Sequence, residues 1–156
     1  MTPATLLKVE NAIQRRRETE FAILRLSFAI ATIAALQGAA GVSLAAAAAH
    51  ADASPFLATA SQFLMIHAAA GVGLAALIRT TPRAKAKWLA AIALALQAGV
   101  TLFASDLAAR VFLSGRLFPL AAPIGGGLTI LSWCALAVWA AFAMFAANSL
   151  QKPPES

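Results

Sequence analysis

Four polar side chains lie deep within otherwise apolar stretches of this sequence. Counted at 1.5 Å of helical rise per residue, Gln37, His67 and Gln97 lie roughly 14–17 Å from the start of their stretches, and Ser132 lies at a similar depth. Brought together, such side chains could form a hydrogen-bonded layer between helices or line a path for a proton or small ligand. A relay usually needs an acid beside the base, and no Asp, Glu, Lys or Arg accompanies His67 at this depth. The pattern therefore favours a structural polar layer.

A second polar group lies toward one end of these stretches and contains His50, Asp106 and Arg110. Because Asp106 and Arg110 are four residues apart, they share a helix face and can form an ion pair. This pair is the favoured interpretation, and a ligand-binding site is the alternative. A haem between His50 and His67 is disfavoured, because helical rise separates them by about 16 Å of depth and a second protein would have to supply an axial ligand.

The sequence carries no enzyme signature. It contains no HExxH motif, no GxSxG in a strand–turn–helix setting, no paired carboxylates and no cluster of metal ligands. Cys134 is the single cysteine, so an internal disulfide and a Cys-rich metal site are both excluded. We therefore expect a protein that is not an enzyme and that binds neither a metal nor a cofactor.

The elements that carry these residues are four long apolar runs. Apolar residues make up 61% of the 156 residues, charged residues only 12%, and the mean hydropathy is +0.79. Each run has about 20 residues or more, enough to cross roughly 30 Å of hydrocarbon as a helix. The runs are apolar on every side, which does not suit a soluble bundle. The sequence predicts an all-α integral membrane protein, a four-helix transmembrane domain over residues 26–147 with spans near 26–49, 56–78, 88–109 and 119–147.

The distribution of Lys and Arg predicts how these spans are oriented. Ten of the twelve basic residues lie in residues 1–25, 79–87 and 148–156, and the other two, Arg110 and Arg116, lie between the third and fourth runs. The positive-inside rule therefore places both termini in the cytoplasm. Topology explains the basic charge of the chain, so we expect no nucleic-acid binding.

Residues 1–25 form a predicted cytoplasmic helical extension of the first span. Thr2 can cap a helix, Pro3 suits its first position, and no other Pro or Gly occurs before Gly38. A modest apolar stripe, formed by Leu6, Val9, Ile13 and further residues, lies beside basic side chains. Such a helix could lie on anionic lipid or dock onto a partner protein.

Several landmarks resemble a family of small bacterial membrane proteins, the domain of unknown function 423 family. The sequence APIGG at residues 122–126, followed by Ser132 and Trp133, is similar to the TPIGG…GW signature that opens the last helix of that family. The matching positions are Pro123, Ile124, Gly125, Gly126 and Trp133.

Both histidines fall on further family landmarks. Residues 48–50 are similar to a GAH motif, and residues 63–67 to a YQxxH motif in which Phe63 and Leu64 replace Tyr and Gln. Residues 102–107 lie where the family has LFSGSL. The resemblance spans residues 35–145 and implies four membrane helices in the bacterial inner membrane, with no assigned activity.

These observations predict a membrane protein that acts by packing against other components. The leading hypothesis is an accessory or scaffolding subunit of a larger membrane complex, embedded in the lipid bilayer and contacting other subunits or further copies of itself. The alternative is a small carrier or channel that uses the polar layer of Gln37, His67 and Gln97. A haem- or quinone-binding module is the weakest hypothesis.

Overall fold

Four α-helices account for nearly all of the computed structural model, which describes residues 3–50 and 54–149. They are α1 (Pro3–His50), α2 (Pro55–Thr80), α3 (Arg83–Phe112) and α4 (Ala121–Ser149). Each contains a stretch long and apolar enough to cross a membrane. No strand occurs among the described residues, so the all-α, four-helix class is confirmed. The expected cap Thr2 and the tail from residue 150 onward lie outside the described residues.

The helices differ from the expected spans mainly at their ends. α1 is one continuous helix of 48 residues, so the extension and the first span form a single element. At 1.5 Å per residue it is about 72 Å long, more than twice the thickness of the hydrocarbon core. α4 begins at Ala121, two residues later than predicted, because Leu120 has a positive φ of 69° that a helix cannot contain. The amide of Ala121 instead donates to the carbonyl of Phe118 (3.2 Å) and closes the preceding turn.

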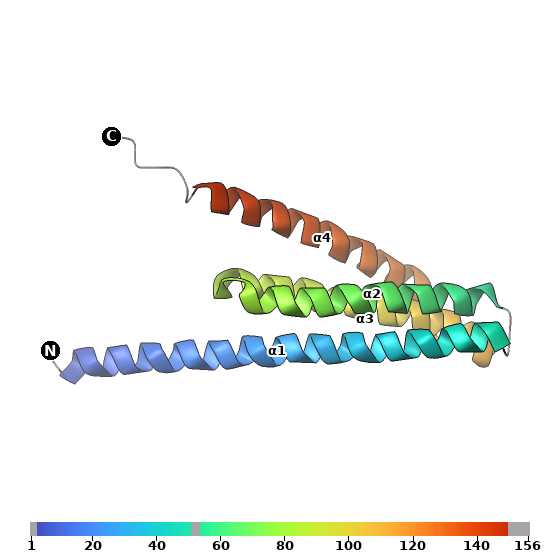
Figure 1. The fold of residues 1–156 in the computed structure, drawn as a ribbon, viewed down its shortest axis with the longest axis horizontal. Coiled ribbons are helices and arrows are strands. Elements are labelled where there is room, and N and C mark those ends of the chain that lie inside the picture. Colours follow the sequence, from blue (N-terminus) through green and yellow to red (C-terminus); the bar gives the residue numbers. More distant parts are fainter. Residues whose placement is uncertain (1–2, 51–53, 150–156) are drawn as a thin grey trace.

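α1, α2 and α3 pack side by side, and α4 packs against α3 (Figure 1). The buried side of α1 repeats at alternating intervals of three and four residues: Ser27, Ile30, Ala34, Gln37 and Gly41. This spacing keeps one seam of a helix in contact with its neighbours. The seam consists mostly of small residues, and a Cβ on Gly41 would lie 2.7 Å from Cγ of Met65 in α2. A larger residue at position 41 would clash with Met65, so glycine there lets the two helices approach closely.

α4 joins the bundle near its N-terminal end and diverges from it toward its C-terminal end (Figure 1). The point of closest approach to α3 lies at Gly99 and Gly125. A Cβ on Gly125 would lie 2.5 Å from the backbone nitrogen of Phe103 and 2.8 Å from the carbonyl oxygen of Gly99. The carbonyl of Gly125 also accepts a hydrogen bond from Oγ1 of Thr129 (2.9 Å). Backbone contact at these glycines thus sets where α4 crosses α3.

Two glycines of α4 test this crossing. Gly125→Ala should lower the free energy of unfolding by about 1–3 kcal/mol, because its methyl group would have to displace the backbone of α3. Gly127→Ala is the matched control: a Cβ there meets nothing within 4 Å, so the better helix propensity of Ala should stabilise α4 by up to about 1 kcal/mol. Unfolding of both variants in mild detergent measures the difference, and equal midpoints would contradict the assigned crossing.

Candidate functional site

The first polar contact in the middle of the bundle joins α1 to α3. The side-chain nitrogen Nε2 of Gln37 donates to the backbone carbonyl of Gln97 (3.0 Å) and to Oγ1 of Thr101 (2.8 Å). The hydroxyl of Thr101 in turn donates to the same carbonyl of Gln97 (2.7 Å). The interhelical bond therefore ends on the backbone of Gln97, and its side-chain amide takes no part.

The side-chain amide of Gln97 lies in the notch that Gly71 leaves in α2. Gln97 is 1% exposed, and a Cβ on Gly71 would overlap its Nε2. Within the described part of the chain, neither Nε2 nor Oε1 of Gln97 has a hydrogen-bond partner, and Oε1 of Gln37 has none either. Buried polar atoms without partners cost free energy. These two glutamines are therefore the least satisfied polar groups of the core.

The second polar contact joins α2 to α4 through His67. The indole nitrogen of Trp133 lies 3.2 Å from Nε2 of His67, and Nδ1 of His67 lies 2.7 Å from the carbonyl of Phe63. An indole N–H can only donate, so Nε2 must accept and Nδ1 must carry the proton that is donated to Phe63. Both ring nitrogens of a neutral imidazole are thereby satisfied.

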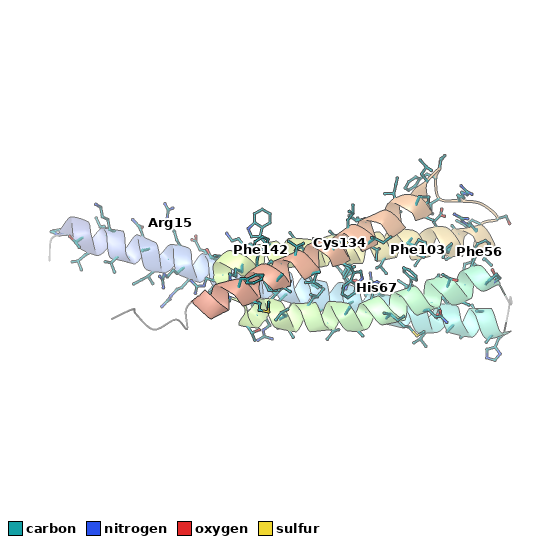
Figure 2. All side chains as sticks on the ribbon, turned by 90° about the horizontal axis from the view of Figure 1, so that it is seen from above. Arg15, Phe56, His67, Phe103, Cys134 and Phe142 are labelled. Atoms are coloured by element: carbon teal, nitrogen blue, oxygen red, sulfur yellow. The ribbon has the colours of Figure 1, made fainter. Side chains whose placement is uncertain are left out.

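Two aromatic rings, those of Phe63 and Trp133, contact His67, which is labelled in Figure 2. The Phe63 ring stacks on His67 with centroids 5.3 Å apart, and Phe63 also contacts Phe103 of α3 at 4.6 Å. Aromatic contacts of this kind add to the burial energy of the rings. The cluster of Phe63, His67, Phe103 and Trp133 thus links α2, α3 and α4.

The sequence led us to expect one layer of four polar residues, and the structure forms two separate contacts instead. Gln37 bonds to α3 and His67 bonds to α4. The hydroxyl of Ser132 donates to the carbonyl of Leu128 in its own helix (2.7 Å). Side chains at the same depth need not point toward one another, because successive side chains of a helix are rotated by 100° about its axis. Thr101 was not identified from the sequence as a member of this contact. Its position one turn after Gln97 could have indicated that the two residues lie on the same side of α3.

Asp106 is the centre of the second polar group. Its carboxylate is fully buried and accepts hydrogen bonds from Nε of Arg110 (2.9 Å) and from the backbone amide of Leu117 (3.0 Å). The four-residue spacing thus forms the expected ion pair. The Leu117 contact adds a second function, because it fastens the α3–α4 connection to α3.

The guanidinium of Arg110 lies 5.5 Å from the ring centroid of Phe56, at the start of α2. This cation–π contact connects the ion pair to a second helix. The structure does not place His50 in this group: it is exposed at the end of α1, and its side chain makes no hydrogen bond or ion pair with the described residues. The sequence could not exclude His50, because depth along a helix says nothing about direction.

The glycines of the signature-like segment have a packing function. Gly125 lies against the backbone of α3, and a Cβ on Gly126 would lie 3.7 Å from the ring of Phe103. Pro123 and Ile124 are exposed. Trp133, two turns further along α4, supplies the hydrogen bond to His67. In residues 3–50 and 54–149, no three His, Cys, Asp or Glu side chains gather as a possible metal site.

These features define a multi-pass helical membrane protein in which a few buried polar side chains tie helices to one another. The chain belongs to a family described as "Protein of unknown function (DUF423)", whose model matches residues 24–126, about two thirds of its length. The match begins where α1 starts to bury side chains, and it includes Gly125 and Gly126 but not Trp133. No curated protein and no solved structure is significantly similar to the chain.

The His67–Trp133 hydrogen bond can be tested by substituting two tryptophans, one that forms the bond and one that does not. Trp133→Phe keeps an aromatic ring but leaves Nε2 of His67 without a donor, so the free energy of unfolding in detergent should fall by about 1 kcal/mol. His67→Leu should cost a similar amount. Trp88→Phe is the control, because Trp88 is 72% exposed and its indole N–H makes no hydrogen bond with the described residues. Equal stability of the two Trp→Phe variants would contradict a stabilising role for the bond.

Proposed function

We propose that this protein is a non-enzymatic accessory or scaffolding subunit that packs against a larger complex in the bacterial inner membrane. The observation that carries the proposal is the unbroken helix α1, which projects well beyond the connection between α2 and α3 (Figure 1). Its first part lies outside the bundle and presents apolar side chains that no described residue of the chain covers.

The projecting part of α1 has a surface suited to another helix. Leu6, Val9 and Ile13 are 54%, 45% and 49% exposed, and their spacing places them on one face. Exposed apolar groups are individually common, but a stripe of them on a projecting helix favours an interaction surface. The part of α1 that packs against the core of the bundle starts near Ile23. The stripe lies well before it in the chain.

The direction of this helix favours a protein partner over the lipid surface. A helix that lies on a membrane has to turn where it leaves the bilayer, whereas α1 continues straight from span to extension (Figure 1). Sharp kinks generally arise at Pro, Gly/Ser pairs or helix bulges. Between Pro3 and Gly38 there is neither Pro nor Gly. A straight α1 carries about 20 residues, or about 30 Å, away from the membrane boundary.

The proposal includes an orientation with both termini in the cytoplasm. Of the eleven Lys and Arg residues that the structure describes, nine lie in the N-terminal part of α1 or around the α2–α3 connection, which supports this orientation. The projecting helix would then meet its partner on the cytoplasmic side.

The apolar stripe is tested by combining Leu6→Ser, Val9→Ser and Ile13→Ser in the full-length chain. If the stripe binds a partner subunit, proteins co-purified in mild detergent should be lost while membrane insertion and stability are retained. The control combines Arg15→Gln, Arg16→Gln and Arg17→Gln, which removes charge from the same helix and keeps the stripe. If the serine variant retains every partner and only the glutamine variant loses membrane-surface attachment in a salt-dependent manner, the extension binds lipid instead.

A small carrier or channel is the second candidate, favoured by the unpartnered amide atoms of Gln37 and Gln97. Such atoms could bind a passing solute. Proteoliposomes with a proton or osmotic gradient separate the two functions. Under the accessory-subunit proposal, wild-type and Gln97→Leu liposomes leak protons and water no faster than protein-free liposomes. A faster wild-type rate that Gln97→Leu abolishes, and that the exposed-site control Gln62→Leu leaves unchanged, would favour the carrier.

A further inference from the structure

A pocket of about 500 Å³ lies where the connection between α2 and α3 meets α1. Its walls come from the last turn of α2, the first residues of α3 and one face of α1. Its apolar part contains Ile23, Leu24 and Ile78, and its polar part contains Glu20, Arg79, Thr80, Thr81 and Arg83. The pocket is distinct from both polar contacts in the middle of the bundle.

Two guanidinium groups hold this end of the bundle together. Arg83 forms an ion pair with Glu20, and the guanidinium of Arg79 lies 5.3 Å from the ring centroid of Phe28. Glu20 lines the pocket and Phe28 does not, and both arginines are among the lining residues. The hydroxyls of Thr80 and Thr81 both donate to the carbonyl of Leu77 (3.1 and 2.7 Å). The arginines are therefore the principal donors that remain for a ligand.

The charge of the pocket favours an anion. Two arginines and one glutamate line it, so its charged side chains leave it with a net positive charge. Neither member of the ion pair is buried: the side chain of Arg83 is 37% exposed and that of Glu20 is 58% exposed. An incoming anion can thus reach Arg83 and compete with Glu20 for it.

The position of the pocket decides which anion is available. α2 ends at Thr80 and α3 begins at Arg83, so the pocket lies at the boundary of the bilayer whichever way the protein faces. At that level lipid headgroups supply phosphate, while the apolar floor adjoins the acyl chains. Arginine matches phosphate oxygens with paired N–H donors, and basic pockets between membrane helices bind anionic headgroups.

We propose that this pocket, bounded by Arg79 and Arg83, binds the phosphate headgroup of an anionic phospholipid. Glu20 limits the affinity, because its carboxylate occupies Arg83 when no lipid is bound. Lipid in this position would bridge α1 to the α2–α3 connection and stabilise the end of the bundle from which the extension projects.

The test measures how phosphatidylglycerol, titrated against phosphatidylcholine, raises the unfolding temperature of the full-length protein in a neutral detergent. Wild type should be stabilised by phosphatidylglycerol specifically. Each lost guanidinium should raise the half-saturating lipid concentration roughly 5-fold, so the Arg79→Gln and Arg83→Gln double variant should require about 25-fold more. The control, Arg15→Gln with Arg16→Gln, removes the same charge outside the pocket and should keep the wild-type response.

Glu20→Gln separates lipid binding from a purely structural ion pair. It breaks the pair with Arg83, as Arg83→Gln does, but it removes negative charge from the pocket, so the half-saturating concentration should fall roughly 5-fold. An unchanged lipid response of the double arginine variant would overturn the proposal, as would a weaker response of Glu20→Gln. Equal stabilisation by millimolar inorganic phosphate would overturn the assignment to lipid.

Discussion

Close approach of helix backbones is the physical constraint on which the rest of this structure depends. Lipid removes the hydrophobic drive that joins helices in water, so membrane helices associate through tight packing and a few hydrogen bonds. The α1 seam meets this need with Ala34 and Gly41, and the α3–α4 crossing meets it with Gly99 and Gly125. α4 has no glycine after Gly127, and toward its C-terminal end it leaves its neighbours (Figure 1).

The polar side chains follow from this packing, because backbones that approach closely bring a few of them within bonding distance. Gln37 reaches a carbonyl of α3, and Trp133 reaches across from α4 to His67. Asp106 is satisfied by Arg110 and by the connection that follows α3. Among the described residues, Oε1 of Gln37 and the whole amide of Gln97 have no partner, and Gly71 makes room for the Gln97 amide without bonding to it. Gln97 is therefore the residue at which a conducting path can be told apart from a purely structural contact.

The two ends of the bundle differ in a way that bears on function. Near Asp106 the chain closes on itself through a buried carboxylate that is paired with Arg110. At the other end, α1 projects with apolar groups exposed, and the arginines at the α2–α3 connection are partly free. The asymmetry suits a protein whose contacts with partners and lipid headgroups concentrate on one side of the membrane. The family match covers residues 24–126, so the projecting part of α1 lies outside it, as does most of α4.

The sequence by itself determined the class and most of the helices. Apolar runs that are long enough to cross the bilayer have to be helical. The absence of Pro and Gly between Pro3 and Gly38 was enough to predict a helical extension. Only the tertiary structure decided which polar residues meet. Gln37, His67 and Gln97 share a depth, but their partners depend on how each helix is rotated about its axis. Nearly uniform apolar faces carry no signal for that rotation, which is set by where glycine and alanine let the backbones touch.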